Sequence, residues 1–260
     1  MLVRDVIEKL ELLSPRFYAE KWDNCGLLAG HMDSAVSKVM LAVDATDDVV
    51  RQAVDAKVDM LITHHPLIFG GIMNVNDQSF VGRRLLKLIE HGIALYAMHT
   101  NFDIRGMADA AADMLELKDT SVLEVTYQDD KGTEGIGRVG CFDESMSLRE
   151  CCELVKSTFD VDAVKVFGDL DKEISVVAIS PGSGKKMSMQ ALKEGADVFI
   201  TGDIDHHEGI DAVASGLCII DAGHFGVEKL FVPYIKAYVA SQMPSVTVLM
   251  ADEKAPFIII

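Results

Sequence analysis

Two adjacent histidines, His64 and His65, stand where an apolar stretch meets a proline in the segment LITHHPLIF (61–69). On a regular strand, neighbouring side chains point to opposite faces, so both rings reach one ion only if the backbone bends. Pro66 favours such a bend, because a proline ends the ladder and restricts the residue before it. The pair therefore indicates either two neighbouring metal ions, one for each ring, or one ligand beside a histidine hydrogen-bonded to the backbone.

Three further polar clusters follow predicted strands, in HTNFD (99–103), TGDIDHH (201–207) and DAGHFGVE (221–228). His224 and Glu228 have the spacing that puts two side chains on one helix face, although the same spacing is common in solvated helix pairs. Three imidazoles and two carboxylates exceed the three protein ligands of a catalytic zinc, and they suit two ions joined by a bridging carboxylate and water. We therefore predict a dinuclear site with five ligands: His64, His65, Asp103, His224 and Glu228.

Other polar residues of these clusters are candidates for proton transfer or substrate contact. We expect His99 to orient a carboxylate or a water, with direct ligation as the alternative. His207 and Asp203 are candidates for the lining of the cleft, with a solvated loop as the alternative. Trp22, Asp23 and Asn24 in WDNCGLLAG (22–30) are candidates for the pocket wall, and a buried tryptophan that anchors a turn is the alternative.

The segment SPGSGKK (180–186) looks like part of a phosphate-binding loop. Its spacing does not match GxxxxGK followed by Ser or Thr. A glycine turn that opens a helix can still hold an anion through its N–H groups, so Gly182 and Ser183 are candidates for substrate contact. A plain turn from strand to helix is the alternative.

The elements that must position these residues alternate along the chain. Apolar runs at 38–44, 58–63, 93–100, 174–180, 196–201 and 216–221 are predicted strands, and 46–57, 80–92, 107–117, 147–159, 185–195 and 227–243 are predicted helices. This alternation predicts an α/β fold with mostly parallel sheets flanked by helices. The Gly- and Asp-rich stretch 127–140 predicts the boundary between an N-terminal lobe, 1–126, and a C-terminal lobe, 127–260.

The two halves resemble each other. Val39–Thr63 aligns without a gap with Val177–Thr201, and matched pairs include Asp59 with Asp197. We interpret the chain as two similar, pseudo-duplicated α/β lobes, with a shared βαβ architecture as the alternative explanation of the few identities. Ligands of open α/β sheets bind at the carboxyl ends of strands. The metal site is therefore expected between the lobes, with His64, His65 and Asp103 from the first and His224 and Glu228 from the second.

Composition narrows the classes of function. The chain has 260 residues and a formal net charge of -17, with no basic run, which disfavours nucleic-acid and anionic-membrane partners. No segment approaches the roughly 18 apolar residues of a membrane span. The N-terminus lacks a signal-peptide pattern, and the five cysteines form no CxxC pair, so we expect reduced thiols and a cytoplasmic protein. The apolar C-terminus PFIII (256–260) is expected to pair as a strand or to be buried at a subunit contact.

Five motifs, WDNCGLLAG, HHPLIF, HTNFD, TGDIDHH and DAGHFGVE, occur in the order seen in one family. Over essentially its whole length the chain resembles the Nif-three-like dinuclear-metal family, the GTP cyclohydrolase 1 type 2 homologues, in the short form without an inserted middle domain. The resemblance implies the same five metal ligands, two divalent ions per chain, a pair of interlinked α/β lobes and assembly into a toroidal homohexamer. Cys25 stands where an apolar residue is usual, and we expect it to affect packing only.

Two functions are compatible with these expectations. The first is a metal-dependent hydrolase that acts on a nucleotide or a related small molecule through a metal-bridging water, with GTP cyclohydrolase activity as one form. The second is a metal-handling protein, such as a chaperone, insertase or storage module, that turns over no organic substrate. Mixed nitrogen and oxygen ligands suit Zn, Mn, Fe, Co or Ni and do not choose among them.

Overall fold

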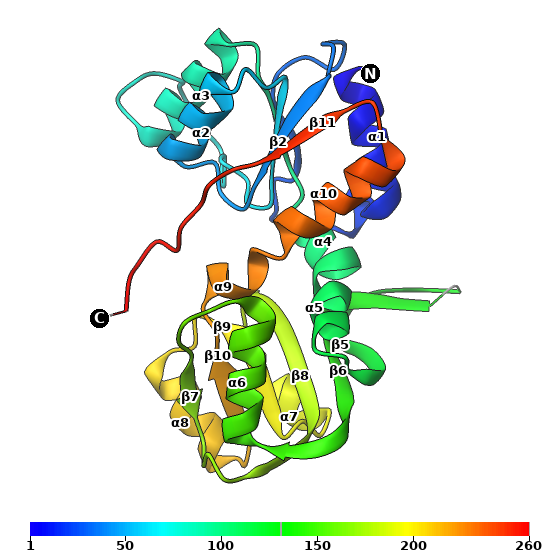
Figure 1. Ribbon diagram of the computed structural model, residues 1–260, viewed down its shortest axis with the longest axis vertical. Helices are drawn as coiled ribbons and strands as arrows, with labels where there is room; N and C mark the ends of the chain where they lie inside the picture. The colour runs from blue at the N-terminus through cyan, green and yellow to red at the C-terminus, as the bar shows by residue number, and fades with distance from the viewer. Residues whose placement is uncertain (131, 260) are drawn as a thin grey trace. The chain divides into compact units, whose positions relative to one another are not determined.

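The computed structural model describes residues 1–130 and 132–259 (Figure 1). Contacts divide the chain into two compact units. The first unit contains Met1–Phe102 and Phe231–Lys254, and the second contains Asp103–Leu230 with the residues after Lys254. The sequence led us to expect a division after residue 126. The two units divide elsewhere. The chain leaves the first unit at Asp103 and returns to it at Phe231, because the last strand pairs with the first sheet.

The first unit is a five-stranded sheet with helices on both faces. Its strand order is β1-β4-β3-β2-β11, and every neighbouring pair is parallel except β1 with β4. The strands are β1 (Gly26–Ala29), β2 (Lys38–Ala42), β3 (Met60–Thr63), β4 (Ala94–Ala97) and β11 (Thr247–Met250). The helices are α1 (Val3–Leu13), α2 (Asp47–Asp55), α3 (Phe80–Glu90), the one-turn α4 (Thr100–Phe102) and α10 (Phe231–Gln242), with a 3₁₀ turn at Arg16–Tyr18.

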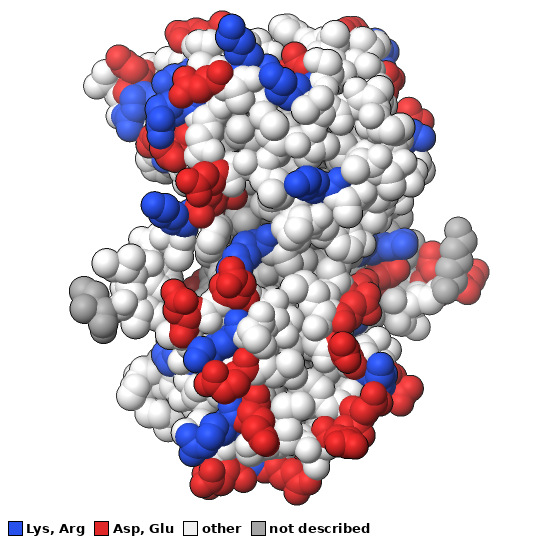
Figure 2. Space-filling model, in the orientation of Figure 1, with Lys and Arg blue, Asp and Glu red and all other residues white. Residues whose placement is uncertain are grey.

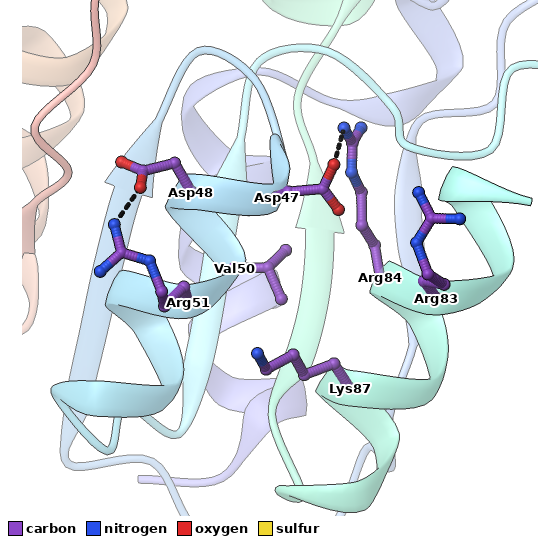
Figure 3. Close-up of a pocket in the computed structure, with 7 residues that line it drawn as sticks. All are labelled: Asp47, Asp48, Val50, Arg51, Arg83, Arg84 and Lys87. Carbon is purple, nitrogen blue, oxygen red and sulfur yellow. Dashed lines mark hydrogen bonds and ion pairs between the residues drawn. The ribbon is translucent and has the colours of Figure 1, made fainter. Parts of the chain in front are cut away.

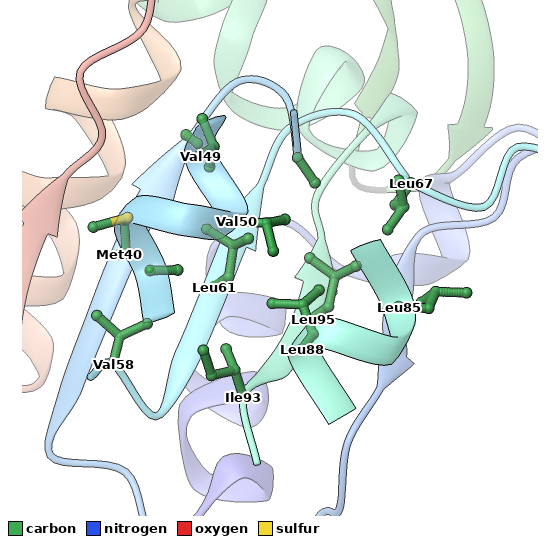
Figure 4. Close-up of a cluster of buried hydrophobic side chains, with 13 residues drawn as sticks. Met40, Val49, Val50, Val58, Leu61, Leu67, Leu85, Leu88, Ile93 and Leu95 are labelled. Carbon is green, nitrogen blue, oxygen red and sulfur yellow. The ribbon is translucent and has the colours of Figure 1, made fainter. Parts of the chain in front are cut away.

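The core of this unit follows from the alternation of side chains along its strands. Met40 and Leu61 point toward α2 and α3, where Val50, Leu85 and other apolar side chains complete a buried cluster (Figure 4). Helices α1 and α10 lie on the opposite face (Figure 1). Helix α2 begins where the Thr46 hydroxyl accepts a hydrogen bond from the Val49 N–H, the expected N-terminal cap. The apolar packing fixes strand β3, and with it the polar residues that follow Thr63.

The second unit is a six-stranded mixed sheet in the order β5-β6-β8-β9-β10-β7. Its centre, β8-β9-β10, is parallel, and the hairpin β5-β6 and the edge strand β7 pair antiparallel. The strands are β5 (Lys118–Asp129), β6 (Gly132–Ser147), β7 (Lys165–Phe167), β8 (Glu173–Ser183), β9 (Val198–Gly202) and β10 (Cys218–Asp221). The helical segments are η2 (Asp103–Met107), α5 (Ala108–Met114), α6 (Leu148–Phe159), α7 (Ser188–Lys193), α8 (His206–Ala214) and α9 (His224–Glu228).

The duplication extends to the pairing of individual residues. Val39 faces Met60 in the β2-β3 pair, and Val177 faces Val198 in the β8-β9 pair, which are the same positions at the offset of 138. The Asp59 carboxylate accepts hydrogen bonds from the backbone N–H groups of residues 37 and 38, at 2.8 and 2.9 Å. Asp197 does the same for residues 175 and 176, at 3.0 and 2.9 Å. The two lobes therefore share one βαβ unit down to the carboxylate that closes it.

Two predicted features take a different form. Of the stretch 127–140, residues 127–129 and 132–140 belong to the hairpin strands β5 and β6, and Lys131 lies outside the described residues. The glycines of this stretch allow close strand contact: a Cβ on Gly135 would lie 1.9 Å from the Glu124 carbonyl oxygen. The helix predicted at 227–243 is two helices, α9 and α10. Pro233 lies in the first turn of α10, where its missing N–H is tolerated, and it cannot continue a helix from α9.

Three further expectations concern cysteines, the C-terminus and membranes. All five cysteines are free thiols, and Cys25 is buried. Phe257, Ile258 and Ile259 form no strand and are exposed, and Ile260 lies outside the described residues. Over the described residues, no helix combines the length and apolarity needed to cross a bilayer.

Candidate metal centre

In the first unit, His64 and His65 directly follow β3, and their backbone N–H groups donate to the carbonyls of Ala42 and Val43 at 3.2 and 2.9 Å. A bend occupies both residues, as Pro66 indicated. The imidazoles therefore lie together, with ring centroids 4.8 Å apart, and do not project from opposite faces. His64 is fully buried, and its Nδ1 is 2.8 Å from the Met98 carbonyl oxygen. The expected bend is confirmed.

A third imidazole, His99, joins this pair. His64, His65 and His99 each offer a ligand nitrogen within 4.8 Å of the others. The Nδ1 of His99 is 2.8 Å from Asp23, whose carboxylate also accepts hydrogen bonds from the Thr100 backbone and hydroxyl. Burial raises the pKa of Asp23, but these hydrogen bonds outweigh it and lower the pKa to about 2. The Asp23 carboxylate is therefore ionised at neutral pH and fixes His99 beside the other two rings.

In the second unit, His224 and Glu228 lie at the two ends of helix α9, with His224 Nε2 at 3.0 Å from a Glu228 carboxylate oxygen. The Nδ1 of His224 is 2.8 Å from Asp203. Asp103 offers a carboxylate oxygen within 4.8 Å of one from Glu228, which is itself 3% exposed. Asp103, assigned to the first lobe from the sequence, is the first residue of this unit. The unit thus gathers one imidazole and two carboxylates of the predicted ligand set.

Gly182 lies against this pair in the fold. Its φ is +76°, and a Cβ at this position would be 2.2 Å from Glu228 Oε1 and 3.6 Å from His224 Nε2. Ser183 ends β8, where it pairs with Gly202. Gly182 and Ser183 therefore form the end of strand β8 beside the candidate ligands, and only a glycine at 182 leaves room there for the Glu228 carboxylate.

His207 has a different environment. It is exposed at the start of α8, its backbone N–H donates to Asp205, and its ring contacts His206 with centroids 5.3 Å apart. Among the described residues, no group of three possible metal ligands includes His207. From the sequence, a solvated loop is the alternative to the cleft; the structure places His207 in the exposed first turn of helix α8.

Trp22 and Asn24 border the histidine group of the first unit. Trp22 is 61% exposed and its ring centroid is 5.9 Å from that of His99, so it is not the buried anchor of a turn. The Asn24 side chain donates to the Ile68 carbonyl at 2.8 Å and joins its loop to the loop after His65.

Sequence reasoning missed Asp44, which accepts a hydrogen bond from His65 Nδ1 at 2.9 Å. Its signal was available, because Asp44 follows β2, the parallel neighbour of β3. The Glu253 carboxylate in turn accepts the backbone N–H groups of Val43 and Asp44 at 2.7 and 3.0 Å. Burial raises the pKa of Glu253. No local pattern links Glu253 to Asp44, since the two are 209 residues apart in the chain.

The hydrogen bonds of the four imidazoles fit metal ligation. In each of His64, His65, His99 and His224, Nδ1 meets a carbonyl or carboxylate oxygen. An acceptor at Nδ1 fixes the orientation of the ring, an arrangement typical of metal-binding histidines, and in His224 the Nε2 also lies 3.0 Å from a Glu228 carboxylate oxygen. Imidazole nitrogens with carboxylate oxygens suit Zn, Mn, Fe, Co or Ni. The donor set therefore fits divalent metal ions.

A separate depression of about 490 Å³ lies between α2 and α3 (Figure 3). Four cationic side chains and two carboxylates line it, and Asp47 pairs with Arg84 while Asp48 pairs with Arg51. Hydrogen bonds from these arginines lower the pKa of both carboxyls. Over the face in Figure 2, basic side chains are interspersed with acidic ones in the same way. The depression contains no histidine and is not the centre described above.

Comparison with known proteins agrees with these features. The family model described as Duf34/NIF3 (NGG1p interacting factor 3) matches residues 1–256. The GTP cyclohydrolase 1 type 2 homolog of Clostridium acetobutylicum is 35% identical over 228 residues, which cover 87% of this chain and 85% of that protein. The homolog of Streptococcus pneumoniae is 36% identical over 243 residues, covering 91% and 89%. A crystal structure of a Bacillus cereus protein related to NIF3 superposes with a TM-score of 0.91 at 25% identity, covering 100% of this chain and 99% of that one. The chain belongs to the Duf34/NIF3 family.

Proposed function

We propose that this protein binds two divalent metal ions and is a metal-dependent hydrolase of a nucleotide or a related small molecule. The proposed ligands are His64, His65, Asp103, His224 and Glu228. That both units contribute to one site stays a prediction from the sequence. GTP cyclohydrolase activity, named for its relatives, is one form of the proposed reaction.

The observation that carries this proposal is the hydrogen bonding of the imidazoles. His64 is fully buried, its Nδ1 lies 2.8 Å from the Met98 main-chain carbonyl oxygen, and it offers a ligand nitrogen within 4.8 Å of those of His65 and His99. Packing of a hydrophobic core does not require three histidines whose ring nitrogens converge. At His224, Asp203 holds Nδ1 and a Glu228 carboxylate oxygen lies 3.0 Å from Nε2, so an imidazole and a carboxylate converge, which supports a second ligand group.

Divalent ions at such ligands lower the pKa of a water and polarise a phosphoryl or carbonyl oxygen. The chain's own groups prepare the site for them. Asp44 and Asp203 hold His65 and His224 in one orientation, and each carboxylate increases the basicity of the imidazole it contacts. Asp23 holds His99 in the same manner, so His99 is suited either to ligation or to proton transfer near the reacting group.

The test combines metal content with turnover. The protein is loaded with each candidate metal, its bound metal is counted by mass spectrometry, and hydrolysis of nucleotides and phosphodiesters is screened. His64→Ala and Glu228→Ala should lose metal and turnover together. His91→Ala is the matched control, because among the contacts described this exposed histidine only donates a hydrogen bond from Nδ1 to the Lys87 main-chain carbonyl of its own helix. Turnover that persists in both site variants refutes the hydrolase, and full metal content in both refutes the ligand set.

The metal-handling alternative makes a different prediction in the same experiment. Metal would be bound and lost in the site variants, but no substrate would be turned over. An exchange assay with a chromogenic chelator then measures whether the ions leave rapidly, as delivery requires. Metal-dependent turnover by the unmodified protein excludes this alternative.

We also propose that copies of the chain assemble, with the homohexamer expected from its resemblance as the form. The exposed apolar residues Phe257, Ile258 and Ile259 support a subunit contact, because isolated apolar tails are costly in water. Light scattering should give a hexamer mass that falls in Ile259→Asp. Leu12→Asp is the control of equal exposure, 69% against 70%. A monomeric unmodified protein refutes the assembly. The five free thiols support a cytoplasmic location.

A further inference from the structure

Two exposed aromatic rings, Trp22 and Phe69, stand beside the histidine group of the first unit. Trp22 is 61% exposed and Phe69 is 67% exposed, although large aromatic side chains are usually well buried. Their ring centroids are 5.7 Å apart, and each ring meets His99 nearly edge-on, at 5.9 and 6.0 Å. The three rings thus form a corner in which Trp22 and Phe69, tilted by 49° to each other, are mostly exposed.

The loops that carry these rings are held in place by hydrogen bonds. The Asn24 side chain donates to the Ile68 carbonyl at 2.8 Å, which joins the loop of Trp22 to the loop of Phe69. The Asp23 carboxylate holds His99 and the Thr100 backbone at 2.8 and 3.0 Å. A ring that stacks here therefore meets surfaces that are already arranged, so little conformational entropy is lost on binding.

The position of the corner relates it to the candidate metal centre. His99 offers a nitrogen within 4.8 Å of the ligand nitrogens of His64 and His65. A molecule whose planar ring rests on Trp22 and Phe69 would therefore present its remaining groups to these imidazoles. The Asp23 carboxylate and the Asn24 side-chain N–H donor are engaged with the protein, which leaves the aromatic faces as the main contact surface.

We propose that Trp22 and Phe69 form a stacking site for the planar ring of a purine nucleotide. Aromatic side chains stack on any nucleobase, because every base has a π-face, and the larger purine ring covers more of the two surfaces. The site holds the base without reading its edge, so adenine and guanine bind alike. This inference rests on the proposed function for the chemistry that follows binding, but the stacking itself needs neither metal nor turnover.

The test uses Trp22 as its own reporter, since it is the only tryptophan of the chain. Metal-free and metal-loaded protein are titrated with guanosine monophosphate, adenosine monophosphate and ribose phosphate, and tryptophan fluorescence is recorded against N-acetyltryptophanamide. Both nucleotides should quench the fluorescence saturably and with affinities within a few-fold of each other, and ribose phosphate should not. Phe69→Leu should weaken binding about tenfold, within the range found for removal of one stacking ring.

Phe17→Leu is the matched control, because Phe17 is also 67% exposed but packs on Tyr18. It should bind the nucleotides as the unmodified protein does. Quenching that does not saturate, equal quenching by ribose phosphate, or unchanged affinity in Phe69→Leu overturns the stacking site. Failure of the hydrolase is separate: saturable quenching without turnover refutes the proposed reaction and keeps the stacking site, whereas nucleotide turnover without quenching refutes the stacking site alone.

Discussion

Replacement of Arg138 should destabilise the second unit far more than replacement of its ion-pair partner, Asp109. Arg138 is 5% exposed, and its guanidinium contacts Asp109 twice, at 2.5 and 2.8 Å. It also donates to the carbonyls of Gly135, Gly137 and Ile104 at 3.0, 2.8 and 3.4 Å. Three of the five contacts are therefore to main-chain carbonyls of β6 and η2, so the guanidinium joins these segments whether or not Asp109 is present.

The expected loss of stability follows from how the contacts of Arg138 are divided between Asp109 and the main-chain carbonyls. Arg138→Met removes all five hydrogen bonds and leaves carbonyls in a poorly hydrated place, for which about 4 kcal/mol is expected. Arg138→Lys keeps the charge but not the planar fork, and about 2 kcal/mol is expected. Asp109→Asn removes a carboxylate that is 53% exposed, and such a half-exposed pair contributes only about 1 kcal/mol.

Urea unfolding at neutral pH, followed by circular dichroism, measures the three free energies of unfolding. The slopes of the transitions must agree for the values to be compared. If Asp109→Asn costs as much as Arg138→Met, the ion pair dominates and the role given to the carbonyls is wrong. An Arg138→Lys variant as stable as the unmodified protein would show that the fork geometry is immaterial.

Three further predictions follow from backbone and carboxylate positions. Lys57 has φ +52° at the end of α2 and Gly195 has φ +79° at the equivalent place after α7, so Lys57→Gly should raise, and Gly195→Lys should lower, the free energy of unfolding by about 1 kcal/mol. If thermal unfolding shows that both substitutions change the stability in the same direction, this prediction is wrong. Burial raises the pKa of Asp59, but hydrogen bonds from residues 37 and 38 outweigh it and lower the pKa below 3.8. The Asp59 carboxylate therefore stabilises the fold above pH 3.8, and this stabilisation is lost as the pH falls through the folded-state pKa. Asp59→Asn should lower the free energy of unfolding at pH 7 and lower it progressively less below pH 3.8. Denaturation at several pH values measures this difference. Gly182→Ala should displace Glu228 and lower bound metal severalfold, and a variant with full metal content on mass spectrometry would contradict the close approach.

Periodicity and turn residues predicted most of the fold. The helix expected at 80–92 is α3, Phe80–Glu90, and the strand expected at 58–63 is β3, Met60–Thr63. Such elements have a local signal, because buried faces repeat along the sequence. The glycines of β6 had no such signal: Gly135 is required by the approach of another strand, and the same residue type in a linker looks identical.

The candidate centre was predicted in part for the same reason. Ligand types that follow strand ends can be recognised one segment at a time, so His64 and His224 could be proposed as ligands from the sequence. Their hydrogen-bond partners are distant in sequence: Asp23 reaches His99 across 76 residues, and Met98 reaches His64 across 34. Only the three-dimensional packing brings these acceptors to the rings.

The path of the chain through its two units has a consequence for biosynthesis. The first unit needs residues 231–254, which supply α10 and β11, and the second unit is complete in sequence by residue 230 apart from the few residues after 254. On the ribosome the later segment of the chain can therefore finish folding before the earlier one. Until then β2 has an unpaired edge where β11 will later pair. Because Val39, Met40 and Leu41 on that strand are apolar, the edge is prone to aggregation in the nascent protein. Synthesis that stops before β11 would leave a folded second unit attached to an aggregation-prone first one.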